Sequence, residues 1–547
     1  MGVQLGRRVV WLSVISLLLL AALGGRLYHL QVTKNVAYTR IAHDQRTLSL
    51  PLAPGRGLIL DRNEEPLTDP HQSWQVAVFP ALLDDAEAEA RALSRILGVP
   101  AIELLADFPQ KQPGWLRIGR ELAEAEGLRV KEAGLSGIAA GPVLSRVGPD
   151  ALARHLVGYT NVSGGARGLE LAFDKELKGS DVPALTAWLD GRGQALEGLG
   201  IRTFVPTAGK VPYRVVTTID QRFQEAVEEV LDSRKDDRPA AAVVMDPSTG
   251  EVLAMASRPD FAYGDDLQPN DPALKNRALE PQPPGSVFKA IIAAAALQAG
   301  KVKPDERFHC DGHADLNGWK VTDAGHGWLT FAEAMAKSCN IVFAQVGVGR
   351  LGVTPMREAA ELFGFGAATG VLGRPWPEES EGFVPPVGSD NAVQMAIGQG
   401  DLRVTPLQIA RAFSAIANGG ALPPARLIKA VKSPAGEVIE RPAAGRPQRV
   451  ISKETAATVQ DLLAGVTQPK GAGTGQLAWV AGAGSAGKTG SAETGGEQIH
   501  AWFAGYVPQW KPQWVIVVMV EDGKFGGQAA APIFREIGQR LIATSGY

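Results

Sequence analysis

The sequence is short of the features that define several classes of protein. Its 547 residues include only two cysteines, so it can form at most one internal disulfide bond. Its formal net charge is −3 and it has no basic stripe, which argues against a nucleic-acid partner. We find no internal repeat. With 45 % hydrophobic residues, the chain is long enough for two or three domains with substantial cores.

Long hydrophobic runs are also scarce, and the one clear example lies near the start. Residues 9–25 carry no charge, and Arg7 and Arg8 precede them. This length is at the short end of a transmembrane helix. A cleaved signal peptide is the alternative, but residues 27–32 continue the helix with interfacial side chains and favour retention. We expect residues 1–8 to form a cytoplasmic tail and residues 9–32 a transmembrane and juxtamembrane segment. The remainder then lies outside the cytoplasmic membrane, in the periplasm or on the outer face.

A first short motif, Ser286-Val-Phe-Lys289, opens a segment that is free of proline and glycine as far as Ala299. We predict a helix from Ser286, because Pro284 and Gly285 precede it and Gly300 follows. Lys289 then lies one turn from the Ser286 hydroxyl. A lysine can take a proton from a serine if burial depresses its pKa, so Ser286 is a candidate nucleophile and Lys289 its candidate base.

A second motif, Ser338-Cys-Asn340, follows a capping box at Thr330 and Glu333 that starts a short helix. Residues i and i+2 do not share a helix face, so Ser338 and Asn340 can face one cleft only from a turn between two helices. We expect Ser338 to relay a proton and Asn340 to hold a substrate amide.

A third motif, Lys488-Thr-Gly490, is followed by Ser491. We predict an edge strand here, along which an extended peptide can dock. Gly490 allows close approach of a backbone. Lys488 and the hydroxyls of Thr489 and Ser491 are suited to a peptide carboxylate. The backbone N–H groups of Ser286 and Ser491 are candidates for an oxyanion hole.

We predict an α/β (α+β) fold. Two strand-like runs at 240–245 and 251–256, together with 488–492, 500–507 and 514–520, indicate a five-stranded antiparallel sheet flanked by helices, the last at 532–543. We expect this catalytic domain to cover residues 213–547. Residues 33–212 alternate short strands with Ala/Glu/Leu-rich helices and predict an elongated α+β pedestal.

The two cysteines, Cys310 and Cys339, lie in one 30-residue window that also holds Asp323 and His326. Three interpretations stay open: a disulfide bond, two buried free thiols, and a structural zinc site formed by these four residues. A zinc ion here would brace the turn at 338–340 and take no part in the chemistry. Catalysis by these motifs requires no cofactor.

Together, the three motifs resemble those of the penicillin-binding and serine β-lactamase superfamily. Further segments narrow the resemblance to class B penicillin-binding proteins: Arg56-Gly-Leu-Ile-Leu-Asp-Arg-Asn63, Gly168-Leu-Glu170, Gly398-Gln-Gly400 and His500-Ala-Trp-Phe503. The resemblance implies a monofunctional peptidoglycan D,D-transpeptidase with a dimerisation-type pedestal, acylated by β-lactam antibiotics at Ser286. Ser491 departs from the family's commoner threonine, which we expect to tune activity.

The resemblance also implies partners and leaves alternatives. Peptidoglycan stem peptides, β-lactams, the membrane and a membrane glycosyltransferase of the wall-synthesis complex are the expected partners. The alternatives are a D,D-carboxypeptidase or β-lactamase-like hydrolase, and a scaffold or β-lactam sensor. No glycosyltransferase signature precedes the pedestal and no wall-binding repeat is expected after it. The segment 310–340 inclines us towards a role in elongation and cell shape over division.

Overall fold

The computed structural model describes residues 2–546 with short gaps. The gaps are 52–54, 69, 107, 109–115, 118–121, 146, 149, 162–163, 180–183, 191–195, 197–198, 200, 205–210, 263–267, 269, 317, 387–391 and 444. The described chain divides into two compact units. The first comprises residues 1–55, 70–146 and 180–210, and the second comprises residues 56–69, 147–179 and 211–547.

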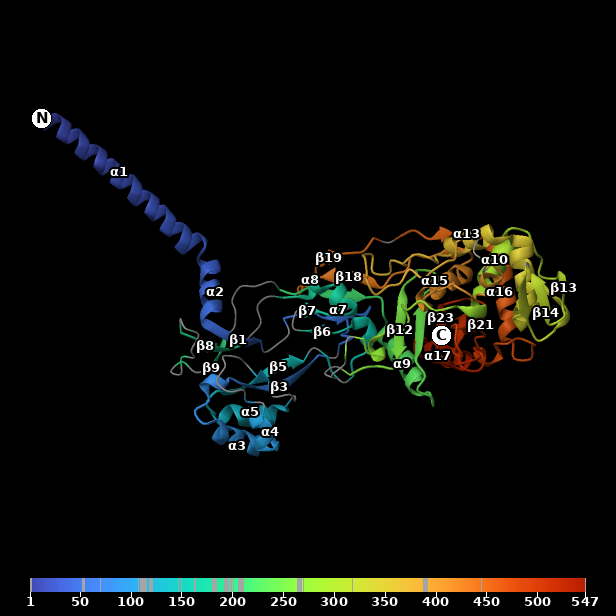
Figure 1. The fold of residues 1–547 in the computed structure, drawn as a ribbon, viewed down its shortest axis with the longest axis horizontal. Helices are drawn as coiled ribbons and strands as arrows, with labels where there is room; N and C mark the ends of the chain where they lie inside the picture. The colour runs from blue at the N-terminus through green and yellow to red at the C-terminus, as the bar shows by residue number, and fades with distance from the viewer. Residues whose placement is uncertain are drawn as a thin grey trace. The chain divides into compact units, whose positions relative to one another are not determined.

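The first unit begins with the long helix α1 (Gly2–Tyr28), a short π-helical stretch η1 (His29–Thr33) and α2 (Asn35–Arg46) (Figure 1). Residues Val9–Thr33 have a mean hydropathy of 2.0 and are long enough to cross a membrane. No other helix in the described ranges passes the same test of length and composition. This helix fits the single-pass membrane anchor that the sequence predicts.

The remainder of the first unit is an α+β structure. Its three-stranded sheet has the order β4 (Leu116–Arg117), β3 (His71–Val78), β5 (Ile138–Ser145). Helices α3 (Ala86–Leu97), α4 (Ala101–Ala106) and α5 (Glu124–Glu132) accompany it. Helix α3 begins where the Asp85 carboxylate caps two backbone N–H groups, and it ends at Gly98 in the left-handed region. A second sheet pairs β8 (Ala184–Trp188) with β1 (Thr47–Pro51) and β9 (Ile201–Phe204).

The second unit is built on the five-stranded antiparallel sheet that the sequence predicts. Its strand order is β12 (Val252–Arg258), β11 (Ala240–Met245), β23 (Trp514–Val520), β22 (Ile499–Val507), β21 (Ala486–Glu493). Strand β21 therefore lies at one edge of the sheet. Alternate residues of the central strands enter two different cores, because side chains alternate across a strand.

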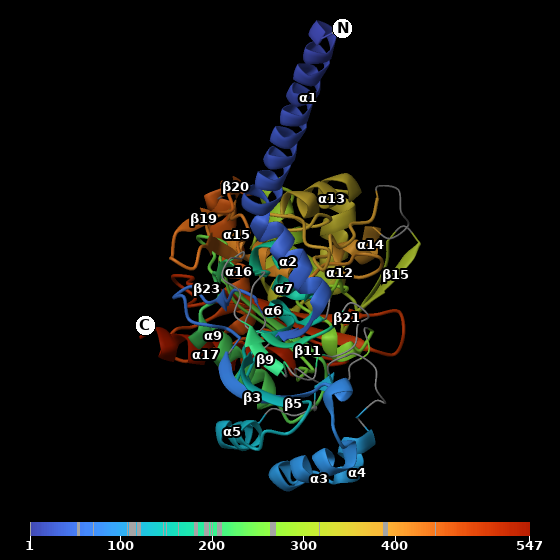
Figure 2. The same ribbon diagram turned by 90° about the vertical axis from the view of Figure 1, so that its left-hand side faces the viewer.

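Helices cover both faces of this sheet. Helices α9 (Gln221–Asp232) and α17 (Ala530–Ser545) pack together, as Figure 2 also shows, and share one core with Phe503, Ile516 and Val518. Helix α15 (Pro406–Ala417) packs on the opposite face. It starts at a capping box of Thr405 and Gln408 with Pro406 at its first position.

Several further helices of the second unit lie on the side of the sheet that carries α15. They include η5 (Gly285–Phe288), α10 (Lys289–Gln298), α11 (Phe331–Lys337), α12 (Asn340–Ala344), η6 (Gln345–Leu351), α13 (Val353–Leu362), α14 (Ala392–Ala396) and α16 (Lys453–Thr467). Two small two-stranded sheets precede α11. In these, β13 (Arg307–Cys310) pairs with β16 (Gly327–Thr330), and β14 (His313–Leu316) pairs with β15 (Trp319–Thr322).

Two early segments fold with this second unit. Strand β2 (Ile59–Leu60) pairs with β10 (Arg214–Thr217), which continues to β18 (Ile428–Lys432) and β19 (Val438–Glu440). The buried Arg56 guanidinium forms ion pairs with Glu170 at 2.9 Å and Asp174 at 2.6 Å. These contacts join two of the segments that carry the family resemblance. The boundaries at residues 33 and 213 stay predictions.

Candidate active site

Ser286 lies in a single 3₁₀ turn, η5, immediately before α10. The predicted helix thus begins as a tighter turn, a common start for an α-helix. Gly285 has φ = 57°, and its N–H donates to the Gly398 carbonyl at 2.8 Å. A Cβ on Gly398 would meet the Gly285 oxygen at 2.0 Å, so the glycine allows this close contact. The Ser286 side chain is half-buried and reaches a cleft.

Lys289 is fully buried one turn after Ser286. Its Nζ donates to the Ser338 carbonyl at 2.6 Å, to Asn340 Oδ1 at 2.6 Å and to Ser338 Oγ at 3.4 Å. Burial lowers the pKa of Lys289 to about 7, against the opposing effect of nearby Asp323 and Cys339. The side chain is thus held in place and poised to exchange a proton near neutral pH.

Ser338 and Asn340 are brought to Lys289 by the turn that the sequence predicts. The Thr330–Glu333 capping box starts α11, which ends with Ser338 at φ = 61°. Asn340 then begins α12, and its N–H donates to the Asp323 carboxylate at 2.6 Å. The left-handed residue lets positions two apart contact one lysine, which a continuous helix does not permit.

Lys488 on β21 is also fully buried, but its contacts are weaker and local. Its Nζ donates to the Thr489 carbonyl at 3.1 Å and to Thr489 Oγ1 at 3.4 Å. Burial, and secondarily the charge of Lys289, hold the pKa of Lys488 well below its ordinary value. A Cβ on Gly490, opposite Trp502 on β22, would lie 2.9 Å from the Pro284 carbonyl. Gly490 therefore permits the close approach between β21 and the segment that leads to Ser286.

The outer edge of β21 carries a side chain that imitates a paired strand. Gln399 Nε2 donates to the Ser491 carbonyl at 3.1 Å, and the Glu493 N–H donates to Gln399 Oε1 at 3.2 Å. In a strand the N–H and C=O of one residue point to the same side, so the Ser491 N–H also points away from β22. That direction agrees with the oxyanion role expected of the Ser491 N–H.

One cleft of about 430 Å³ brings the predicted residues together. Its lining contains Ser286, Ser338, Thr489 and Ser491, whereas Lys289, Asn340 and Lys488 make the contacts described above. The other lining residues are Gly473, Thr474, Gln476, Leu477, Phe525, Gly526, Gly527 and Gln528.

Several of these residues were missed by sequence reasoning. Thr474 Oγ1 lies 2.6 Å from Thr489 Oγ1, and the exposed Phe525 and Leu477 contribute apolar surface to the cleft. Thr474 and Phe525 belong to glycine-rich loops without periodicity, and Leu477 belongs to the short 3₁₀ helix η7 (Gln476–Ala478). The run Gly473-Thr-Gly475 and the pair Gly526-Gly527 are the signals that could have directed attention to them.

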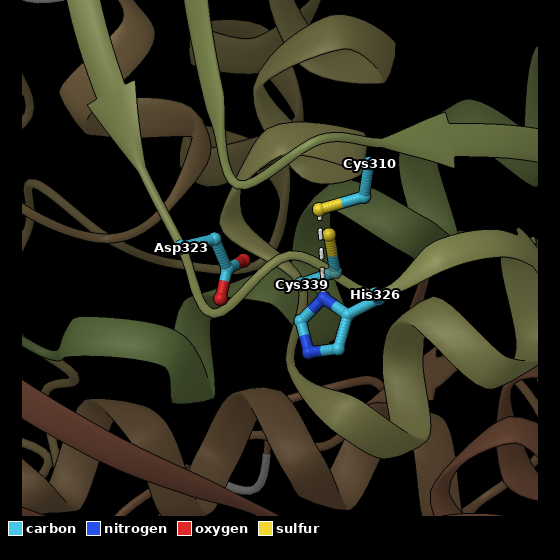
Figure 3. Close-up of side chains that lie close together, drawn as sticks. All are labelled: Cys310, Asp323, His326 and Cys339. Carbon is cyan, nitrogen blue, oxygen red and sulfur yellow. Dashed lines mark hydrogen bonds between the residues drawn. The ribbon is translucent and has the colours of Figure 1, made fainter.

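A second cluster lies beside the turn at 338–340 (Figure 3). Cys310, Asp323, His326 and Cys339 each offer a ligand atom, and these atoms all lie within 4.8 Å of one another. Both thiols are free and buried, and Cys310 Sγ is 3.5 Å from His326 Nδ1. Burial raises the pKa of the Cys339 thiol to about 12. The structure therefore brings together all four residues of the predicted metal set.

Comparisons with known proteins agree with this arrangement. Residues 240–539 match the penicillin-binding protein transpeptidase domain, and residues 51–182 match the penicillin-binding protein dimerisation domain. The chain thus belongs to the family of class B penicillin-binding proteins, and it is an enzyme of the transpeptidase class.

The similarity to relatives and solved structures extends over most of the chain. The stage V sporulation protein D of Bacillus subtilis is 30 % identical, over 98 % of this chain and 85 % of the relative. The probable peptidoglycan D,D-transpeptidase PbpC of Pseudomonas aeruginosa is 30 % identical, over 97 % of this chain and 94 % of the relative. Penicillin-binding protein 3 of Mycobacterium tuberculosis, solved with aztreonam, superposes with a TM-score of 0.65 at 28 % identity, over 91 % of this chain and 97 % of that one.

Proposed function

We propose that this protein is a peptidoglycan D,D-transpeptidase that cross-links stem peptides through an ester on Ser286. The observation that carries the proposal is the position of Lys289. It is fully buried, follows Ser286 by one turn, and is held by both polar residues of the 338–340 turn. Ser286, Ser338 and the β21 hydroxyls share one cleft, so a nucleophile, a base, a relay and a docking edge are adjacent.

The chemistry follows from these positions. Ser286 Oγ attacks the carbonyl carbon of the penultimate D-Ala of a stem peptide, and its proton passes to Lys289. The bond to the terminal D-Ala breaks, and the proton held by Lys289 passes through Ser338 and Lys488 to the leaving amine. The amine of a second stem then attacks the ester, and the proton that this amine loses returns to Ser286. The N–H groups of Ser286 and Ser491 stabilise the oxyanion.

Substrate docking is assigned to the edge of β21. An extended peptide adds to this edge by main-chain hydrogen bonds, and Asn340 holds one of its amides. Lys488, Thr489 and Ser491 bind the terminal carboxylate. A β-lactam reacts at the same serine, because its strained amide takes the place of the peptide bond and its acyl group stays attached.

Intact-mass spectrometry after exposure to benzylpenicillin tests the acyl-enzyme. We expect the full mass of the drug on the wild type and on the matched control Ser545→Ala, which alters an exposed serine at the end of α17. Ser286→Ala should remain unmodified. No adduct on the wild type, or one that persists in Ser286→Ala, contradicts the proposal.

Analysis of the reaction products tests whether the acceptor is an amine or water. With a stem-peptide donor and an amine acceptor, a transpeptidase gives the cross-linked dimer. Release of the terminal D-Ala without any dimer would instead identify a carboxypeptidase.

The proposal extends to location and organisation. Residues 9–32 anchor the chain, residues 1–8 stay in the cytoplasm, and a pedestal at 33–212 and a transpeptidase domain at 213–547 lie outside the cytoplasmic membrane. A membrane glycosyltransferase that supplies glycan strands is the proposed partner. Protease added to spheroplasts should remove the epitope of a C-terminal tag; protection of the tag would contradict this topology.

Acyl transfer by Ser286 and Lys289 needs no metal. We propose that Cys310, Asp323, His326 and Cys339 hold a zinc ion with a structural role, because two thiols, an imidazole and a carboxylate match the ligands zinc favours. Metal analysis of the purified chain should find about one zinc per chain. A chain that is metal-free as purified and takes up no added Zn²⁺ would remove this part of the proposal.

A further inference from the structure

The metal cluster and the catalytic turn share a residue. Cys339 is the middle residue of the turn, and its two neighbours, Ser338 and Asn340, are the groups that hold Lys289 Nζ. A bond from Cys339 Sγ to a metal would fix the centre of this turn. Its two flanking residues could then not shift without straining that bond.

Asp323 provides a second link between the cluster and the turn. Its Oδ2 accepts the Asn340 N–H at 2.6 Å, while its carboxylate also contributes a ligand atom to the cluster. This N–H is the first of helix α12. One carboxylate can thus contact a metal ion and set the position of the residue whose side-chain oxygen binds Lys289.

The other two ligands attach the turn to the paired strands β13 and β16. Cys310 ends β13 and His326 immediately precedes β16, and the His326 N–H donates to the Cys310 carbonyl at 3.0 Å. These two residues are thus already adjacent through the backbone. In Figure 3 the two sulfur atoms and the His326 ring gather at one point, with the Asp323 carboxylate facing them.

The separations suit zinc. Bonds of about 2.0–2.3 Å in a tetrahedron place ligand atoms about 3.3–3.8 Å apart, so side-chain movements of about one ångström would close a set that lies within 4.8 Å. Hard cations such as Mg²⁺ and Ca²⁺ favour all-oxygen sites and do not match two thiols.

We propose that zinc bound by Cys310, Asp323, His326 and Cys339 positions Asn340, and through it Lys289, so that metal occupancy governs the rate at which Ser286 is acylated. The inference rests on the proposed acyl-transfer function and on the proposed zinc ion, and it adds a coupling between them. Asp323 is then a positioning residue for the catalytic lysine. Loss of the metal should slow acylation about 10- to 100-fold, the usual effect of disturbing such supporting contacts.

The test uses the full chain in detergent and follows zinc content and benzylpenicillin acylation in parallel. Cys310→Ser removes a ligand that lies outside the catalytic turn. His309→Gln is the matched control, because this neighbouring histidine is exposed and pairs with Asp311 outside the cluster. We expect Cys310→Ser to lose zinc and acylate about 10- to 100-fold more slowly, and His309→Gln to keep both properties.

Measuring the acylation rate and the dissociation constant separately distinguishes a misplaced lysine from general loss of structure. A misplaced lysine slows the acylation step itself, while the apparent dissociation constant for the drug stays near the wild-type value. A second experiment on the wild type keeps the test valid if the Cys310→Ser variant fails to fold. Chelation of zinc from the wild type should reduce the acylation step, and added Zn²⁺ should restore it.

Each contrary result has a distinct meaning. Zinc loss with an unchanged acylation step, in the variant or after chelation, overturns the coupling and leaves the structural zinc in place. A metal-free wild type that takes up no added Zn²⁺, or an intact mass showing a Cys310–Cys339 disulfide, overturns the metal site and the coupling together. A zinc-loaded wild type that never reacts with benzylpenicillin contradicts the proposed function and removes the coupling with it, while its zinc content still reports on the metal site.

Discussion

The two sides of the cleft each carry a fully buried lysine, but they hold it differently. Lys289, on the helical side, donates to three acceptors supplied by the 338–340 turn. Lys488, on the sheet side, reaches only the neighbouring Thr489 of its own strand in the described part of the chain. Equal burial therefore serves two purposes. We infer a fixed base on one side and, on the other, an amine whose protonated form an incoming carboxylate would stabilise.

Removal of the helical-side lysine should have the largest effect. In Lys289→Ala no base remains for Ser286, so benzylpenicillin acylation should slow about 100- to 10,000-fold. Stopped-flow measurement with a fluorescent penicillin checks this, with the exposed Lys301→Ala as the control. A Lys289→Ala chain that acylates at the wild-type rate would refute the base assignment.

Removal of the sheet-side lysine should act mainly on binding. Lys488→Ala loses charge-assisted contacts to the carboxylate, which corresponds to about 10- to 100-fold weaker capture of the drug. The same assay, run over a range of drug concentrations, separates the dissociation constant from the acylation step. If Lys488→Ala slows only the acylation step and leaves the dissociation constant unchanged, Lys488 does not act mainly in binding, and the proposed difference between the two lysines is wrong.

A change of pH should test the helical side without mutation. Lys289 acts as a base only when neutral, and burial lowers its pKa to about 7. The acylation step should therefore fall about tenfold for each pH unit below 7 and level off above it. The profile of Ser545→Ala should coincide with that of the wild type. An acylation step that is constant from about pH 5 to pH 8 would show that another group takes the proton.

The smallest effect is expected at the edge of β21. Gln399→Ala removes two hydrogen bonds to this strand, to the Ser491 carbonyl and from the Glu493 N–H. The two bonds together contribute about 2 kcal/mol, which sets an upper limit of about 30-fold; because β21 stays paired with β22, we expect a smaller loss of acylation efficiency, of about fivefold. Gln498→Ala is the control. Gln498 lies in the nearby exposed loop, and its described hydrogen bonds are made by its backbone carbonyl, which the substitution keeps. Equal rates for the two variants would argue against a role for Gln399 in shaping this edge.

Much of the sheet could be predicted from sequence because its signals are local. Runs of mostly apolar residues define β11, β12, β22 and β23, and the capping box at Thr330 and Glu333 marks a helix start correctly. The predicted antiparallel sheet of five strands is confirmed. The start of α10 as a 3₁₀ turn was not predicted; this turn begins at Gly285, whose N–H bonds to the distant Gly398 carbonyl, a contact that local sequence signals do not reveal.

For the candidate active site, too, local motifs could be predicted from the sequence and long-range contacts could not. The three motifs could be found because each has a fixed local spacing, and their roles stay predictions until tested. Gln399, Thr474 and Phe525 could not be assigned from sequence, because their positions at the cleft depend on loops that meet only in the folded chain. The sequence likewise left three interpretations for the cysteines, since only the fold places His326 and Asp323 beside them.

The central claim is that the acyl group forms on Ser286, and peptide mapping after benzylpenicillin treatment tests it most directly. The account predicts that the drug is recovered on the proteolytic peptide that contains Ser286, and that fragmentation places it on this serine. Recovery of the drug on a peptide containing Ser338 or Ser485, or on none, would contradict the account.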